Sequence, residues 1–133
     1  MSTFRLELHD STGLRTFDRV YSFVGTDASG SFGLRAGHAR FMTVLAFGLA
    51  RFREEEASWT YLALPGAVVD FQDNTLWIAA RRSLLDADYC RINVLLREQL
   101  LAEERALEKT RSSLRQMEEE LLRRLWRLGK EGG

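Results

Sequence analysis

The stretch YLALPGAVVDFQDNTLWIAARR, residues 61–82, decides the fold class of this chain. Two pairs of turn-forming residues, Pro65-Gly66 and Asp73-Asn74, divide it into short segments that are mostly apolar. Short apolar segments between turn residues are typical of β-strands, whereas a helix would need a longer uninterrupted run. The stretch therefore predicts consecutive strands joined by tight turns.

The sequence before this stretch repeats the same pattern. Residues 4–9 (FRLELH) alternate apolar and polar side chains, which is the period of a half-buried strand. Residues 16–25 and 47–56 are further strand candidates, and turn residues recur every eight to twelve positions. Short strands at that spacing predict a mainly β N-terminal domain, a sandwich or flattened barrel, over residues 1–85.

The pattern changes at residue 86, because residues 86–128 contain neither glycine nor proline. Asp86 or Asp88 is a suitable helix N-cap, and Gly129 stands where a helix stop is expected. Five leucines recur at intervals of seven residues: Leu100, Leu107, Leu114, Leu121 and Leu128. We therefore predict an α-helical C-terminal domain over residues 86–133.

The middle of this segment, residues 109–113 (KTRSS), is its weakest helical part, because threonine and serine side chains compete for backbone hydrogen bonds. We expect the chain to bend there into an antiparallel helical hairpin of residues 86–108 against 112–128. Leaving the leucines in water would cost on the order of 10 kcal/mol, since burying one leucine is worth ~1.5–3 kcal/mol. The stripe must therefore fold back, dimerise or lie against another protein. Polar residues such as Glu103 and Arg124 at the second heptad position argue against a stable parallel dimer.

Charge and cysteine content exclude several classes of function. The chain has 19 basic and 19 acidic residues, and the balance holds locally, whereas nucleic-acid-binding domains usually carry a positive surplus. We therefore expect no nucleic-acid partner. The single cysteine, Cys90, rules out an internal disulfide and cysteine-based zinc sites. No apolar run approaches the ~18 residues of a membrane helix, and the start does not read as a signal peptide, so we expect a soluble protein without direct membrane insertion.

The sequence also predicts no catalytic site and no metal site. Asp27, Ser29 and His38 lie close together in sequence, but the members of a catalytic triad normally come from distant segments. No phosphate-binding G-x-x-x-x-G-K-[ST] motif is present. We expect His38 to be a loop histidine or an interface contact.

Residues 23–52, FVGTDASGSFGLRAGHARFMTVLAFGLARF, resemble the epsilon subunit of bacterial F-type ATP synthases, which is called delta in mitochondria. The family pattern is a glycine, a short polar loop, G-x-[LF]-G-[IL]-x-x-G-H-A, an apolar run and G-x-[IV]-R. The matching positions are Gly25, Gly30, Phe32, Gly33, Leu34, Gly37, His38, Ala39, Gly48 and Arg51. Residues 61–82 resemble the strands that follow in the family. The variants GHARFMTVL and LALPG resemble a branch found with alternate, sodium-type ATP synthases.

This resemblance implies a non-catalytic subunit of the central stalk whose sandwich binds the gamma subunit and the ring of c subunits. The rotor-facing role is carried over to Gly30, Ser31, Phe32, Gly33, Gly37, His38, Ala39 and Arg40. Glycines suit such a surface, because they let a partner approach the backbone closely. Ser31 departs from the acidic residue that is frequent there, so the resemblance does not imply a charged contact to the c ring from this position.

The helical half resembles the family's regulatory domain, which packs as a hairpin or extends into the alpha/beta catalytic head and inhibits ATP hydrolysis. An imperfect heptad repeat whose central residues have weak helix propensity suits a segment that can adopt two alternative packing arrangements. The regulatory contacts implied on the head are Arg111, Arg115, Arg123, Arg124 and Arg127. Some members bind ATP through [IL]-D-x-x-R-A; here Asp88 and Arg91 keep the nucleotide-binding pair, but Ala87 and Ile92 depart from the motif. We expect a helix-start ion pair there, and no cofactor.

We therefore predict a rotor subunit that couples ring rotation to the catalytic head, peripheral on the cytoplasmic face of the bacterial inner membrane. The complex would translocate protons or sodium ions. The alternative, from another functional class, is a free-standing adaptor that dimerises through its leucine-heptad helix.

Overall fold

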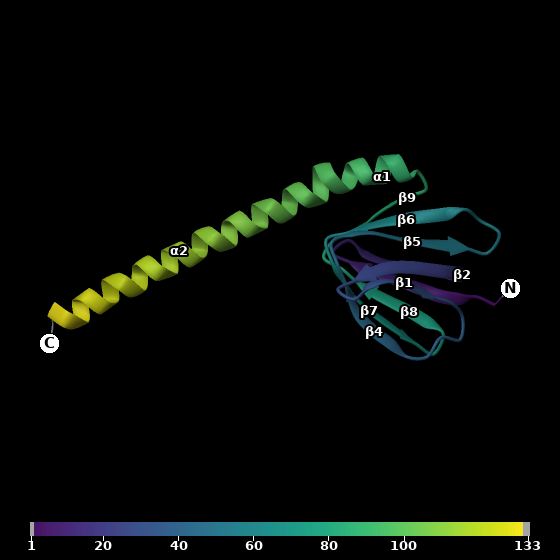
Figure 1. The fold of residues 1–133 in the computed structure, drawn as a ribbon, viewed down its shortest axis with the longest axis horizontal. Helices are drawn as coiled ribbons and strands as arrows, with labels where there is room; N and C mark the ends of the chain where they lie inside the picture. Colours follow the sequence, from purple (N-terminus) through teal and green to yellow (C-terminus); the bar gives the residue numbers. More distant parts are fainter. Residues whose placement is uncertain (1, 132–133) are drawn as a thin grey trace. The chain divides into compact units, whose positions relative to one another are not determined.

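The computed structural model describes residues 2–131, which form nine strands followed by a helical segment (Figure 1). The strands are β1 Phe4–Asp10, β2 Gly13–Asp27, β3 Gly30–Leu34, β4 Phe41–Leu45, β5 Gly48–Glu54, β6 Trp59–Leu64, β7 Ala67–Gln72, β8 Thr75–Ala79 and β9 Leu84–Asp86. The helical elements are α1 Tyr89–Leu95, the π-helix η1 Leu96–Leu101 and α2 Ala102–Glu131. The predicted fold class, a β-sandwich followed by a helical C-terminal part, is confirmed.

The strands fold into two layers joined by the long strand β2 (Figure 1). Hydrogen bonding runs in the order β1-β8-β7-β4-β2-β5-β6-β9, and β3 pairs with β2. β1 also pairs with β2, so β1, β8, β7, β4 and β2 close a ring, as in a flattened barrel. β1 and β8 are parallel, and all other paired strands are antiparallel.

The core lies between the two layers because every second side chain of a strand points inward, and these inward side chains are apolar. In β1 the side chains of Phe4, Leu6 and Leu8 are buried, and the residues between them face outward. The aromatic residues Phe4, Phe23, Phe52 and Phe71 are the largest fully buried side chains. The turn predicted at Asp73 and Asn74 is present, with φ values of 51° and 57°, as a two-residue hairpin loop of positive φ requires.

A second, smaller core joins α1 and η1 to the sheet. Ile92 and Leu100 are fully buried against Ala63 of β6. For this reason the first compact unit runs to Leu101, and Ala102–Gly133 is a separate unit. The predicted domain boundary after residue 85 stays a prediction.

The predicted bend at residues 109–113 is wrong, since α2 runs through these residues without a break. The hydroxyl of Thr110 donates to the carbonyl oxygen of Ala106 at 3.0 Å, so this threonine bonds back into the helix instead of competing with it. With no glycine or proline present, serine and threonine cost too little to end the helix. The irregularity lies earlier, in η1, where the backbone widens by one residue. No helix among residues 2–131 is long and apolar enough to cross a membrane.

Asp10 ties the end of β1 to the segment before β9. Its carboxylate accepts hydrogen bonds from the Ser83 hydroxyl and from the amide and hydroxyl of Thr12, the latter two at 2.8 and 2.6 Å. These bonds, chiefly the one from Ser83, lower the pKa of Asp10 to about 2. Ser83 is buried, so the bond lies partly out of water.

Replacing Asp10 by asparagine should lower the free energy of unfolding at pH 7 by about 1–2 kcal/mol, because hydrogen bonds to a charged acceptor are lost. Asp10 ionises at lower pH in the folded than in the unfolded chain, so its contribution is complete above about pH 4 and is lost as the pH falls towards about 2. Urea titrations of both proteins at pH 7 and pH 2 check this. A stability difference that is the same at both pH values would contradict it.

Candidate partner-binding surface

The residues predicted to face the rotor lie on β3 and on the loop that leads to β4. Gly30, Ser31, Phe32 and Gly33 belong to β3, and Gly37, His38, Ala39 and Arg40 belong to the loop. All are exposed except Phe32, which is half-buried. Its ring contacts Phe41 at 5.0 Å between centroids and packs against the main core. Phe32 therefore supports the surface from beneath, while the other seven residues are open to a partner.

The loop is held by a few defined contacts. The amide of Gly37, whose φ is +78°, donates to the Asn74 side-chain oxygen at 2.9 Å, and the Asn74 amide group donates to the Thr3 carbonyl at 2.8 Å. The Nδ1–H of His38 donates to the Ala39 carbonyl at 2.8 Å, and its ring stands edge-on to Phe71 at 6.0 Å. Backbone from three parts of the chain is thus fixed around Asn74.

The turn between β2 and β3 is held by Asp27. This carboxylate accepts from the amide and hydroxyl of Ser29 at 2.9 and 2.6 Å, and from the Thr43 hydroxyl at 2.7 Å. These bonds, chiefly from Ser29, lower the pKa of Asp27. Asp27 and Ser29 therefore build a turn that is fastened to β4.

Beside the loop, the outer face of β4, β7 and β8 carries an apolar patch. It consists of Met42, Val44, Val68 and Trp77, with exposed fractions of 59%, 64%, 43% and 37%. Val44 and Val68 are directly opposite on β4 and β7. A cluster of exposed apolar side chains on one sheet face marks an interaction surface. We call these four residues the apolar patch.

The apolar patch was not predicted from the sequence, although a signal was present. β4 reads FMTVL and β7 begins AVVDF, so each strand has apolar residues on both its inward-facing and its outward-facing positions. A strand with one solvated face should instead alternate. The departure from alternation could have indicated that a partner covers the outer face.

A mixed polar hollow borders the apolar patch. It has a volume of about 490 Å³ and is lined by Glu7, Asp70, Gln72, Asp73, Thr75 and Trp77. The Asp70 carboxylate lies 4.0 Å from the Nε of Arg40, so this loop arginine reaches the strand face beside the patch. The apolar centre with charged groups at its margin has the anatomy of a protein–protein interface.

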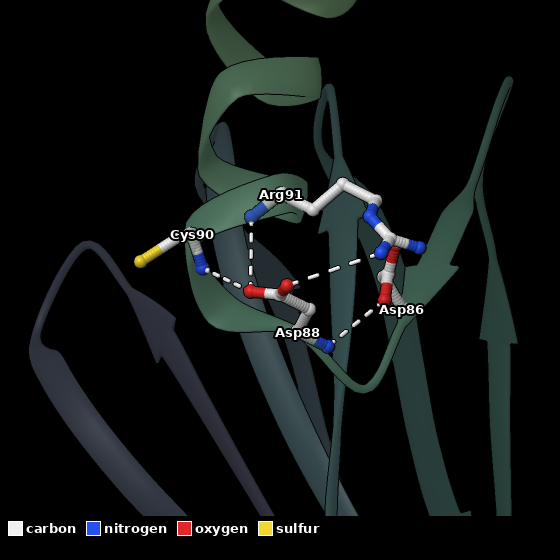
Figure 2. A network of polar contacts seen from close by, with 4 residues as sticks. All are labelled: Asp86, Asp88, Cys90 and Arg91. Atoms are coloured by element: carbon white, nitrogen blue, oxygen red, sulfur yellow. Dashed lines mark hydrogen bonds and ion pairs between the residues drawn. The ribbon is translucent and has the colours of Figure 1, made fainter.

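Asp88 and Arg91 lie at the start of α1, where Asp88 caps the helix (Figure 2). One Asp88 oxygen accepts from the amides of Cys90 and Arg91 at 2.9 and 3.2 Å, which is an N-cap. The Arg91 guanidinium lies 3.5 Å from Asp86 and 4.0 Å from Asp88. The ion pair expected at the helix start is present, and both carboxylates are already engaged by this chain.

The five arginines expected to make regulatory contacts are all exposed on α2. Arg123 and Arg124 lie 3.4 and 3.3 Å from the carboxylate of Glu120. At 100° per residue, Arg111, Arg124 and the others spread over more than one face of the helix. They do not form a single stripe.

Comparisons with known proteins place these features in a family. Residues 3–85 match the model of the ATP synthase delta/epsilon chain β-sandwich domain. The chain is 32% identical over 102 residues to "ATP synthase epsilon chain 2" of Cereibacter sphaeroides, an alignment that covers 76% of this chain and 70% of the relative.

Two solved structures have a similar fold. One is a chain in the Tetrahymena thermophila mitochondrial ATP synthase central stalk and c ring, with a TM-score of 0.56, 17% identity, and coverage of 86% of this chain and 92% of that chain. The other is a chain in the Euglena gracilis mitochondrial ATP synthase, with a TM-score of 0.60 and 18% identity. This match covers 84% of this chain and 66% of that chain.

Proposed function

This chain belongs to the ATP synthase delta/epsilon family, and from that premise we propose that it is a non-catalytic central-stalk subunit which couples rotation of a c ring to the catalytic head. Its sandwich binds gamma and the c ring, and the subunit lies peripherally on the cytoplasmic face of the bacterial inner membrane. Nucleotide chemistry and the translocation of protons or sodium ions belong to other subunits.

The observation that carries this proposal is the apolar patch beside the predicted rotor-facing loop. Val44 is more than half exposed on the outer face of β4, where an isolated protein would gain by having a polar residue. We assign the patch to gamma. The glycine-containing strand β3, with Gly30 and Gly33 exposed, is assigned to the c ring, because its backbone is open to close approach.

Co-expression with gamma tests this proposal. We expect the two chains to co-purify as a stable one-to-one complex in size-exclusion chromatography. Separate elution in buffer of low ionic strength would contradict it.

A second candidate function rests on the exposed leucines of α2. Leu114, Leu121 and Leu128 are 54%, 58% and 63% exposed, so this stripe has no partner among the described residues. A free-standing adaptor would cover it by dimerisation. Sedimentation equilibrium of the purified chain separates the two proposals, since a tight dimer favours the adaptor and a monomer favours the stalk subunit.

For the helical segment we propose a regulatory role, in which α2 contacts acidic surface on the alpha/beta head and restrains ATP hydrolysis. Replacing all five arginines (Arg111, Arg115, Arg123, Arg124 and Arg127) by alanine should raise the ATP hydrolysis rate of the assembled complex by roughly threefold to tenfold. The loss of several surface ion pairs amounts to about 1 kcal/mol, and alanine preserves the helix. Steady-state hydrolysis assays measure this.

The matched control replaces Arg97 and Arg105 by alanine. These two arginines are not among the five predicted regulatory contacts, so the hydrolysis rate should stay unchanged. An unchanged rate in the five-residue variant, with normal assembly, would refute the regulatory role.

A further inference from the structure

The outer face of β2, β5 and β6, together with Arg35 directly after β3, carries an alternating row of arginine and aromatic side chains. The guanidinium of Arg35 lies 4.6 Å from the ring centroid of Tyr21, and Arg53 lies 5.0 Å from the same ring. Trp59 is 5.7 Å from Arg53 and 4.6 Å from Arg51. These five residues, which we call the arginine stack, form a continuous row of cation–π contacts.

The three guanidiniums carry positive charge that the described part of the chain does not neutralise. Arg35, Arg51 and Arg53 have no carboxylate at ion-pair distance among residues 2–129, whereas Arg5, Arg19 and Arg91 each do. Arg35 uses one donor on the Tyr21 hydroxyl at 2.8 Å. Stacking on a ring fixes the plane of a guanidinium but leaves its edge donors available. The stack is therefore an ordered set of donors directed at an anion.

A hollow of about 280 Å³ adjoins the Arg51 end of the stack. Its lining includes Ser31, Leu49, Arg51, Tyr61 and Tyr89. The rings of Tyr61 and Tyr89 meet edge-on at 5.3 Å between centroids and form one wall. An apolar side chain can enter this hollow while a neighbouring carboxylate reaches Arg51.

The arrangement fits an acidic segment of a protein better than other anions. Arg51 and Arg53 are two residues apart on β5 and project from the same face, so their spacing is roughly 7 Å. Carboxylates at alternate positions of an extended chain, or one turn apart on a helix, have a similar spacing. A nucleic acid would gain no long-range electrostatic attraction from a chain whose net charge is zero, whereas nucleic-acid-binding domains usually carry a positive surplus. A small phosphate needs donors that converge on one point.

We propose that the arginine stack is a docking site for an acidic protein segment that places an apolar residue next to its carboxylates. Bidentate guanidinium–carboxylate bonds hold the acidic side chains, and the Tyr61–Tyr89 hollow takes the apolar one. This surface is separate from the apolar patch, although its hollow shares Ser31 with the surface assigned to the c ring. The peptide test below uses the chain alone and does not depend on the assembly proposed above.

A labelled synthetic peptide tests the proposal on the full chain. The probe has about twelve residues, with glutamates at alternate positions followed by a leucine, and its matched version carries glutamines instead. Fluorescence anisotropy measures affinity, and NMR spectra of the arginine Nε–H groups report the site. We expect the glutamate peptide to change the chemical shifts of the Nε–H groups of Arg51 and Arg53, and the glutamine peptide not to bind. The glutamate peptide should bind the Arg51→Gln/Arg53→Gln variant at least about tenfold more weakly than the wild-type chain.

The control variant Arg15→Gln/Arg19→Gln removes the same charge from the other end of β2 and should change affinity by less than about twofold. Equal weakening in both variants, or no binding at about 1 mM peptide, would overturn the proposal. So would tighter binding of phosphatidylglycerol vesicles or of a single-stranded oligonucleotide with the same dependence on Arg51 and Arg53. Those outcomes would assign the stack to a lipid surface or to nucleic acid.

Discussion

A Val44→Lys/Val68→Glu variant is expected to fold normally but to bind gamma at least about a hundredfold more weakly than the wild-type chain. The two residues are directly opposite on β4 and β7, and both are exposed, so the new side chains stay in water and can pair across the strands. In a complex they would be buried against apolar groups, where desolvating charge costs several kcal/mol. Isothermal titration with purified gamma measures the change.

The control for this variant is Leu14→Lys. Leu14 is 53% exposed near the β1–β2 turn, so its replacement also removes an exposed apolar side chain but leaves the apolar patch intact. It should bind gamma as the wild type does, and thermal unfolding of both variants should match the wild type. If the double variant retains full affinity, gamma does not bind at the apolar patch.

The sequence predicted the features that depend on local chemistry. Alternation in residues 4–9 indicates which side chains of β1 are buried, and the structure confirms it. The turn at Asp73 and Asn74 and the N-cap at Asp88 could be predicted because these side chains bond to their own neighbouring backbone or tolerate positive φ. Such effects involve residues close together in the chain.

Features that depend on distant residues could not be predicted in this way. The parallel pairing of β1 with β8 joins Leu6 to Leu76, and alternation says which face is buried but not which strand is the neighbour. The arginine stack brings Arg35, Tyr21 and Trp59 together from three separate strands or their ends. No spacing rule within one segment reveals such a row.

The bend predicted at residues 109–113 is absent because local helix propensity alone is too weak a force to end α2. The serine and threonine residues in 109–113 lower helix propensity by only a few tenths of a kcal/mol each. A cost of this size does not break a helix unless tertiary packing of the two halves rewards the bend. The widened turn is η1, near the place where Leu100 is buried against the sheet, so tertiary packing and not propensity sets the irregularity.

Replacing Gly25 by alanine is expected to lower the free energy of unfolding of the sandwich by about 2–3 kcal/mol, because it overpacks the core. A Cβ at this position would lie 2.9 Å from Leu45 Cδ2 and 3.0 Å from both Phe23 Cε1 and Phe32 Cζ. The two phenylalanine rings are held by the core and by each other, so they cannot move aside without losing contacts. Thermal unfolding should show a fall in Tm of about 10–20 °C.

Gly33 provides a matched control on the neighbouring strand. Its Cβ would lie 3.8 Å from the nearest atom, the Phe23 carbonyl oxygen, so Gly33→Ala should change stability by less than about 0.5 kcal/mol. Adding Leu45→Val to Gly25→Ala removes one of the clashing groups and should restore part of the lost stability, since the two sites share a contact. If Gly25→Ala is as stable as Gly33→Ala, the packing of Leu45, Phe23 and Phe32 does not require a glycine at this position.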